Sequence, residues 1–96
     1  MGQDLQRVVH ALPWFAPESW GGTEQYVAAL ARALRGLNWD SIVMAPARGQ
    51  QVEHYEHQGF SVVRWLPAAA ANEEGSFSRC LQALQADVFH LHGWTP

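Results

Sequence analysis

Two adjacent glycines, Gly21 and Gly22, lie between an apolar run and a helical pattern, and this arrangement constrains the fold more than any other part of the sequence. The run at residues 7–12 is apolar and stops at Pro13, which is typical of a buried strand. After the glycines, apolar residues recur at helical spacing, at Val27, Leu30, Ala31 and Leu34. The sequence therefore predicts a strand, a loop and a helix, in that order.

The same glycines indicate a binding site. A residue without a Cβ lets a ligand approach the backbone closely, and a helix N-terminus offers free N–H groups and the positive end of its dipole to an anion. Gly21, Gly22 and Thr23 are therefore candidates for contacts with a phosphate group. The alternative, that the glycines only supply flexible backbone where a helix begins, stays open at this point.

The rest of the chain continues the alternation of strands and helices. Strands are expected at residues 7–12, 41–45, 60–66 and 87–92, and helices at 23–35, 52–58 and 76–85, the middle one short and ending at Gly59. Strands that alternate with helices are joined by right-handed crossovers into a parallel sheet. The prediction is an α/β, Rossmann-like fold in which the four strands, numbered along the chain, lie in the order 3-2-1-4.

Composition restricts the classes of protein to which the chain can belong. The 96 residues are 48% hydrophobic, which is enough for the core of one small domain. A net charge of −3 with scattered arginines argues against a nucleic-acid surface. Cys80 is the one cysteine, and its place on an apolar helical stripe indicates a core thiol rather than a nucleophile. With Asp4 near the start and no run of about 18 apolar residues, a cytoplasmic protein is expected.

Four stretches, in order along the chain, resemble the N-terminal domain of GT-B-fold glycosyltransferases of family four. They are VHALPWFAP at 9–17, GGTE at 21–24 followed by the helix AALARAL at 28–34, NWDSIVMAP at 38–46, and ADVFHLHG at 86–93. Arg64 and Pro67 also fit the family's usual end to its third strand. The resemblance covers nearly the whole chain apart from residues 48–58.

This resemblance implies an architecture and an activity. Enzymes of the family have two Rossmann-like domains that face each other across a cleft. The N-terminal domain holds the acceptor, and the C-terminal domain holds most of a nucleotide-diphosphate sugar, the donor. Family members usually retain the anomeric configuration and often work without a metal. The chain is therefore expected to be part of a retaining glycosyltransferase that needs no cofactor besides its donor substrate.

Each matching position receives a role from the same resemblance. Gly21, Gly22 and Thr23 would contact the donor diphosphate, in agreement with the argument from the helix N-terminus. His92 would be the catalytic side chain beside the transferred sugar, because ligands of open α/β sheets bind at the carboxyl ends of strands. Three tryptophans would form an aromatic acceptor surface: Trp14, Trp20 and Trp94.

The basic pair and the Glu-x-x-x-x-x-x-x-Glu motif with which the family holds its donor do not occur in the 96 residues. The chain is thus expected to be a partial N-terminal domain, inactive without the C-terminal domain, whose partners are that domain, the donor and an acceptor. Membrane contact is expected only through the acceptor. The last strand would leave an uncovered apolar edge that promotes self-association, formed by Val88, Phe89 and Leu91.

Other functions compete with this one. His90 and His92 have the HxH spacing of several metallohydrolases, but His10, which lies near His90 if their strands are neighbours, is expected to be a hydrogen-bonded sheet histidine, so no metal site is predicted. The charges at 52–58 are expected to form a solvated helix face. A dehydrogenase is disfavoured because eight residues separate the strand from the glycines. A non-enzymatic, flavodoxin-like binding module remains the alternative.

Overall fold

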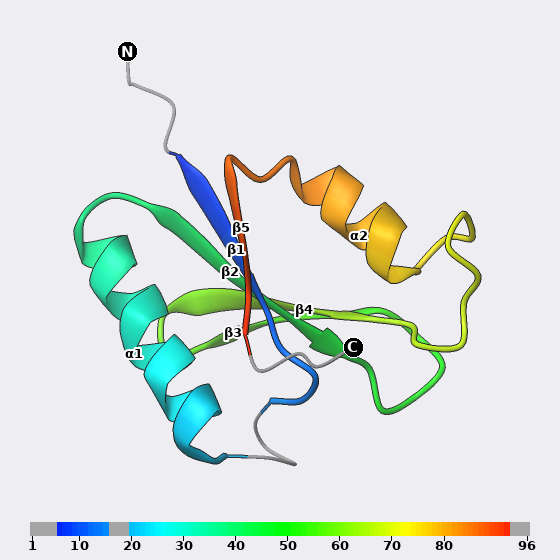
Figure 1. Ribbon diagram of the computed structural model, residues 1–96, viewed down its shortest axis with the longest axis horizontal. Coiled ribbons are helices and arrows are strands. Elements are labelled where there is room, and N and C mark those ends of the chain that lie inside the picture. The colour runs from blue at the N-terminus through cyan, green and yellow to red at the C-terminus, as the bar shows by residue number, and fades with distance from the viewer. Residues whose placement is uncertain (1–5, 16–19, 93–96) are drawn as a thin grey trace.

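A computed structural model, which describes residues 6–15 and 20–92, shows one five-stranded sheet with a helix on each face (Figure 1). Its elements are β1 (Arg7–Ala11), α1 (Gly22–Gly36), β2 (Asp40–Pro46), β3 (Glu53–His57), β4 (Phe60–Trp65), α2 (Phe77–Leu84) and β5 (Val88–Leu91). The strand order is β3-β4-β2-β1-β5, and all neighbours are parallel except β3 and β4. The predicted α/β, Rossmann-like class and the order of the four predicted strands are confirmed.

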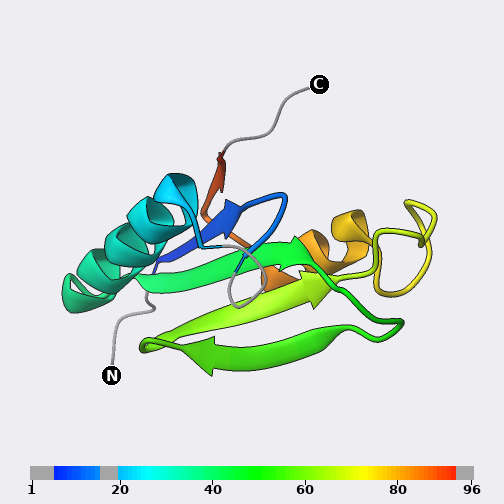
Figure 2. The same cartoon turned by 90° about the horizontal axis from the view of Figure 1, so that it is seen from below.

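The helix predicted at residues 52–58 is wrong, because this segment is the edge strand β3. Tyr55 and His57 are partly buried while their neighbours along the strand are exposed, which is the two-residue period of a strand with one covered face. Gln58 and Gly59 both have positive φ, at 51° and 92°. Two such residues form a tight hairpin turn, so Gly59 joins β3 to β4 rather than ending a helix (Figure 2).

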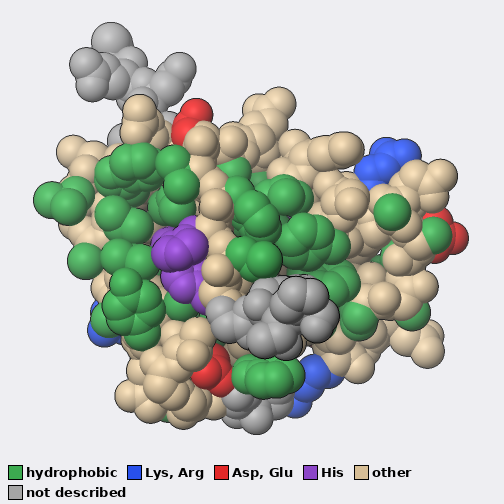
Figure 3. All heavy atoms as spheres, in the orientation of Figure 1, with side chains coloured by type: hydrophobic (Ala, Val, Ile, Leu, Met, Phe, Trp, Pro, Cys, Tyr) green, Lys and Arg blue, Asp and Glu red, His purple; other side chains and the backbone are tan. Residues whose placement is uncertain are grey.

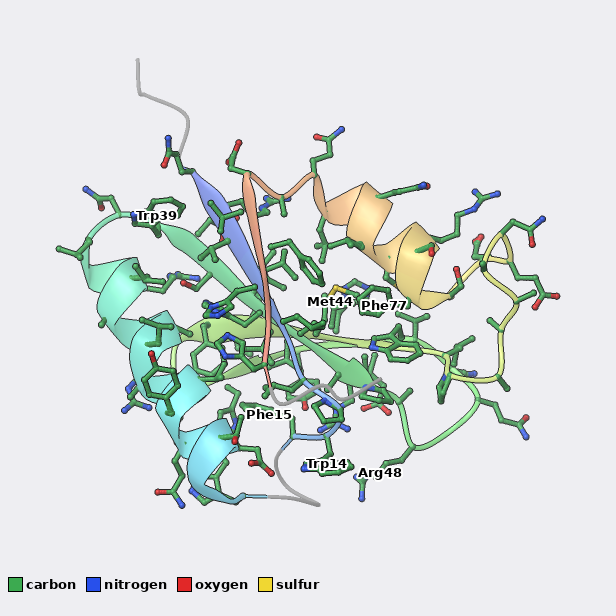
Figure 4. All side chains as sticks on the ribbon, in the orientation of Figure 1. Trp14, Phe15, Trp39, Met44, Arg48 and Phe77 are labelled. Carbon is green, nitrogen blue, oxygen red and sulfur yellow. The ribbon has the colours of Figure 1, made fainter. Side chains whose placement is uncertain are left out.

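The two helices cover opposite faces of the sheet, because alternate residues of each strand contact different helices. On the α1 side the core contains Leu12, Phe15, Val27, Ala28, Ala31, Val43, Ala45, Phe60 and Val62. On the other side α2 covers Val9, Ala11, Ile42, Met44 and Val63, and Figure 4 shows Met44 beside Phe77 of α2. Within the described residues, neither helix combines the length and the apolar composition needed to cross a bilayer.

The packing of α1 differs slightly from the prediction, whereas that of α2 agrees with it. Val27 and Ala31 are buried as predicted, but Leu30 and Leu34 are only half-buried because α1 turns Ala28 toward the sheet instead. The predicted apolar stripe of α2, which includes Cys80, packs against the second core cluster. Burial raises the pKa of the Cys80 thiol, so the thiol stays protonated, in keeping with a core role rather than a nucleophilic one.

One arginine ties the amino ends of the central strands together. The Nε of Arg7 lies 2.7 Å from a carboxylate oxygen of Asp40, and its backbone N–H donates to Asp87 at 2.7 Å. Its guanidinium also donates to the carbonyl of Leu84, at the end of α2. With one end of β1, β2 and β5 held in this way, the carboxyl ends of the parallel strands lie together at the opposite end of the sheet.

Candidate functional site

The carboxyl end of the sheet brings the two main predicted site regions together. β1 leads into the glycine pair that begins α1, and its neighbour β5 leads into His92, whose N–H donates to the carbonyl of Ala11 at 2.9 Å. In open parallel sheets, ligands bind in the crevice outside these strand ends. The prediction that the glycines and His92 share one end of the sheet therefore agrees with the arrangement of the elements.

Neither glycine is required by the protein's own packing. Gly21 is the N-cap of α1 with extended backbone (φ −96°, ψ −164°), and it has no side chain to bond the first N–H groups. A Cβ at Gly22 would meet nothing within 4 Å, and one at Gly21 would meet the Glu24 carboxylate only at 3.4 Å. Both glycines and Thr23 are exposed. Their free N–H groups are thus open to a ligand approaching from solvent.

Glu24 modifies the electrostatics of this helix end. Its side chain is almost completely buried in the first turn of α1, and its carboxylate lies beside Gly21. A negative charge in the first turn stabilises the helix by opposing the dipole. An anion bound here would therefore depend mainly on N–H donors at Gly22 and Thr23, on the side away from Glu24.

His92 lies at the centre of an aromatic and imidazole cluster. It is 8% exposed, and its Nε2 lies 3.1 Å from Nδ1 of His10, a hydrogen-bond distance. The ring of Tyr26 stands edgewise to it with centroids 6.3 Å apart. Because Tyr26 follows Gly22 by one helical turn, this contact places His92 beside the second turn of α1.

The structure adds a third histidine to the predicted pair. His90 and His92 share one face of β5, with ring centroids 3.7 Å apart, and His10 is the register partner of His90 on β1. His10 is hydrogen-bonded, as predicted, but its partner is His92. One ring nitrogen of each of the three histidines lies within 4.8 Å of the others, so His10 stands beside the HxH pair, as expected if their strands are neighbours.

Two of these histidines are held neutral. Burial, reinforced by the neighbouring His92 and His90, lowers the pKa of His10 from 6.5 to about 4. Burial and the adjacent His90 lower the pKa of His92 to about 4 as well. Imidazoles with such values are uncharged at neutral pH and offer one donor and one acceptor nitrogen each.

The two described tryptophans of the predicted aromatic surface differ in their surroundings. Trp14 follows the carboxyl end of β1, is 55% exposed, and lies at the same end of the molecule as Arg48 (Figure 4). Trp20 is 42% exposed but packs edgewise against Phe15 at 5.8 Å and tilted against His57 at 5.7 Å, so the core takes up part of its surface. Trp94 lies outside the described residues.

Two hollows adjoin this end and the histidine cluster. One of about 660 Å³ lies between the segments that follow β2 and β4, and Arg48 contributes to its wall. Another of about 240 Å³ lies between α1, β1 and β5, with His10 and His90 in its lining. The first offers space for a ligand near the strand ends, and the second opens directly onto the imidazoles.

Sequence reasoning did not place Tyr26 in the site, and it treated His10 as a sheet histidine rather than as part of the site. The predicted order of strands 1 and 4 already placed His10 beside His90, and Tyr26 falls one turn beyond Gly22 on the predicted helix. The spacing of residues along each element therefore indicated part of this arrangement. Which side chains point toward each other across β1, β5 and α1 was decided by the helix rotation and the side-chain conformations of the folded protein.

Comparison with protein families gave one match to this region. A family model described as a glycosyl transferase 4-like domain matches residues 21–96, from the first glycine of the pair through α1 and β5. No curated protein and no solved structure matches the chain.

Proposed function

This chain belongs to the glycosyl transferase 4-like family, and we propose that it forms the N-terminal, acceptor-side domain of an enzyme that transfers a sugar from a nucleotide-diphosphate sugar to an acceptor. The observation that carries the proposal is the exposed, glycine-opened N-terminus of α1 beside His92 at the carboxyl end of the sheet. The earlier resemblance to family-four glycosyltransferases agrees with this family membership.

The glycine pair provides the donor site in this proposal. The first N–H groups of α1 have no partner within the helix. Gly22 and Thr23 are both exposed, and Gly22 has no Cβ to obstruct the approach to its N–H. A diphosphate accepts hydrogen bonds from such groups and interacts favourably with the helix dipole. Gly21 shapes the approach by leaving space beside the Glu24 carboxylate.

His92 is the proposed catalytic side chain. Being neutral, it can exchange hydrogen bonds with a sugar hydroxyl near the leaving diphosphate without adding charge. His10 acts as a positioning residue, since its Nδ1 lies 3.1 Å from Nε2 of His92 and is itself fixed in the central strand. Trp14 and the exposed part of Trp20 would contact the acceptor through their ring faces. Transfer would proceed with retention and without a metal in the reaction.

The proposal also includes a second domain. We expect most donor contacts to come from a C-terminal domain, so the 96 residues alone should bind a nucleoside diphosphate weakly and show no turnover. Half a site contributes correspondingly less binding energy, and a Kd of about 1 mM or weaker is expected. The working compartment would be the cytoplasm, where nucleotide sugars serve as donors in this proposal.

Two glycine variants test the donor site. Gly22→Leu should abolish binding of uridine diphosphate, because the side chain occupies the approach to the N–H groups. Gly36→Leu is the matched control, since Gly36 ends the same helix and a Cβ there also meets nothing within 4 Å. Affinity is measured by NMR titration, with the thermal midpoint as a check on folding.

If Gly22→Leu binds the nucleotide as well as the original chain does, the glycines are not the phosphate site. Nucleotide-induced shifts in the original chain that centre away from residues 21–25 would also contradict the proposed donor site.

A further inference from the structure

We propose that His10, His90 and His92 form a binding site for one divalent transition-metal ion of the zinc type. The three residues come from the central strand β1 and from β5 with the residue that follows it, on the face covered by α1. The site goes beyond the proposed sugar transfer, which uses His92 with His10 as its positioning residue and involves no metal.

The distances between the rings are close to those of a metal complex. Two nitrogens bound to one tetrahedral Zn²⁺ at about 2.0–2.1 Å are separated by roughly 3.3 Å. Nδ1 of His10 and Nε2 of His92 are already 3.1 Å apart. One ring nitrogen of each histidine lies within 4.8 Å of those of the other two. Closure on an ion therefore requires a shift of at most about 1.5 Å in one side chain.

The backbone already has the geometry that such a site requires. His10 and His90 are paired in the parallel register of β1 and β5, and His92 follows two residues later, so all three project from the same face. The N–H of His92 donates to the Ala11 carbonyl at 2.9 Å, which fixes the end of β5 against β1. The side chain that has to adjust is that of His90, which is exposed and lies beside His92 with ring centroids 3.7 Å apart.

The chemistry of the buried ring also favours a cation. His10 is 1% exposed, and its Nε2 is buried with no hydrogen-bond partner among the described residues. An ion bound at Nδ1 of His10 would replace the histidine–histidine hydrogen bond with a stronger interaction for the ring, and Nε2 would then carry the proton of the neutral imidazole. Neutral imidazole is the form of histidine that binds metals.

Solvent can reach the cluster. Figure 3 shows histidine side chains gathered at the surface between α1 and β5, next to apolar side chains. The hollow of about 240 Å³ between these elements is lined by His10 and His90. Three imidazole ligands with solvent on one side leave a fourth position for water, the arrangement of open zinc sites. Imidazole donors also accept Co²⁺, Ni²⁺ and Cu²⁺, so Co²⁺ can serve as a spectroscopic probe.

The test is titration of the metal-free 96-residue chain with Zn²⁺ by calorimetry, and with Co²⁺ by visible absorption. We expect one ion per chain with a Kd of about 10 µM or below. His90→Ala should weaken binding at least tenfold, and because His90 is exposed this variant keeps the fold. His54→Ala removes another exposed histidine, on β3 at the opposite edge of the sheet, and should leave the Kd unchanged.

Thermal midpoints in the presence of a chelator confirm that both variants are folded. The proposal is overturned if the chain binds no Zn²⁺ at 100 µM, a concentration about tenfold above the expected Kd. It is also overturned if His90→Ala binds like the original chain, or if His54→Ala loses as much affinity as His90→Ala. None of these outcomes depends on nucleotide binding at Gly22. Failure of the metal proposal therefore does not decide the proposed sugar transfer, which the Gly22→Leu variant tests separately.

Discussion

The two edges of the sheet are built in opposite ways. The β3 edge carries Glu53, His54 and Glu56 outward, and its tight hairpin with β4 joins it antiparallel to the rest. The β5 edge is parallel and exposes apolar side chains, each more than 40% accessible: Val88, Phe89 and Leu91. Charged residues along an edge oppose pairing with another strand, whereas an apolar edge invites it. The β3 edge is therefore protected against pairing with another strand, whereas the β5 edge can pair with one.

The polar side chains near the two edges also have different roles, structural near β3 and, in our proposals, ligand-binding near β5. Beside β3, the buried guanidinium of Arg64 donates to the Tyr55 hydroxyl and to the Pro46 carbonyl, both at 3.0 Å, and so links three strands. Beside β5, the polar groups are imidazoles that lie next to a hollow and to the turn of α1 that follows the glycine pair. Arginine here stabilises the fold, while the histidines are placed to meet a ligand.

The largest effect is expected on stability, when the arginine that links the strands beside β3 is replaced. Arg64→Met should lower the free energy of unfolding by about 4 kcal/mol, because it removes two buried hydrogen bonds from a charged group, each worth about 1.5–3 kcal/mol. Urea denaturation measures the loss. The histidine cluster lies on other strands and should be unaffected in the fraction that remains folded. A change below 1 kcal/mol would show that Arg64 does not hold the β3 edge.

The second prediction concerns the pH dependence of stability, which the buried histidines beside β5 should determine. In chelator, the folded protein should lose stability as the pH falls from 6.5 toward 4, because the unfolded chain binds protons near pH 6.5 while folded His10 and His92 stay neutral until about pH 4. Above pH 6.5 both states are neutral and nothing is lost. For His10 the difference corresponds to roughly 3 kcal/mol.

Denaturation midpoints at pH 7 and pH 5 measure this loss, and His54→Ala should reproduce it because that side chain lies at the other edge. Equal stability at the two pH values would contradict the burial of neutral imidazoles beside β5.

The two edges were predicted with different success, because their sequence patterns differ in strength. The helix α1 and the strands β1, β2, β4 and β5 have strong local periodicity, so the layers and the parallel order followed from pattern alone. Strand β3 has only Tyr55 and His57 as inward positions among charged residues, and its hairpin turn contains Gln58, which is not a typical residue for positive φ. That weak pattern was interpreted as a helix.

Because residues 52–58 were predicted to be a helix, one contact near the site was also not predicted. Trp20 packs against His57, a contact that could not be predicted while His57 was placed on a helix. The histidine cluster was predicted in part, because strand neighbours bring His10 and His90 together. The hydrogen bond between His10 and His92 depends on side-chain conformations that no spacing rule contains.

The smallest effect on stability is expected at the open edge. Phe89 is exposed on β5 and contacts Phe77 edgewise at 6.0 Å, so Phe89→Lys should cost only about 1 kcal/mol. It should nevertheless suppress self-association of the chain, because a charge blocks edge pairing. Sedimentation measures the change, and Glu56→Lys on β3 is the control. Association that persists in Phe89→Lys would show that β5 is not the contact edge.

The central claim is that ligand chemistry belongs to the end of the sheet where β1 leads into α1 and β5 leads into His92. The most direct test is a ¹⁵N NMR titration of the chain with uridine diphosphate, which reports on both edges in one experiment. We expect shifts centred on residues 21–25 and at His92, with little change in β3. Shifts centred on α2 or on the β3–β4 hairpin would contradict it.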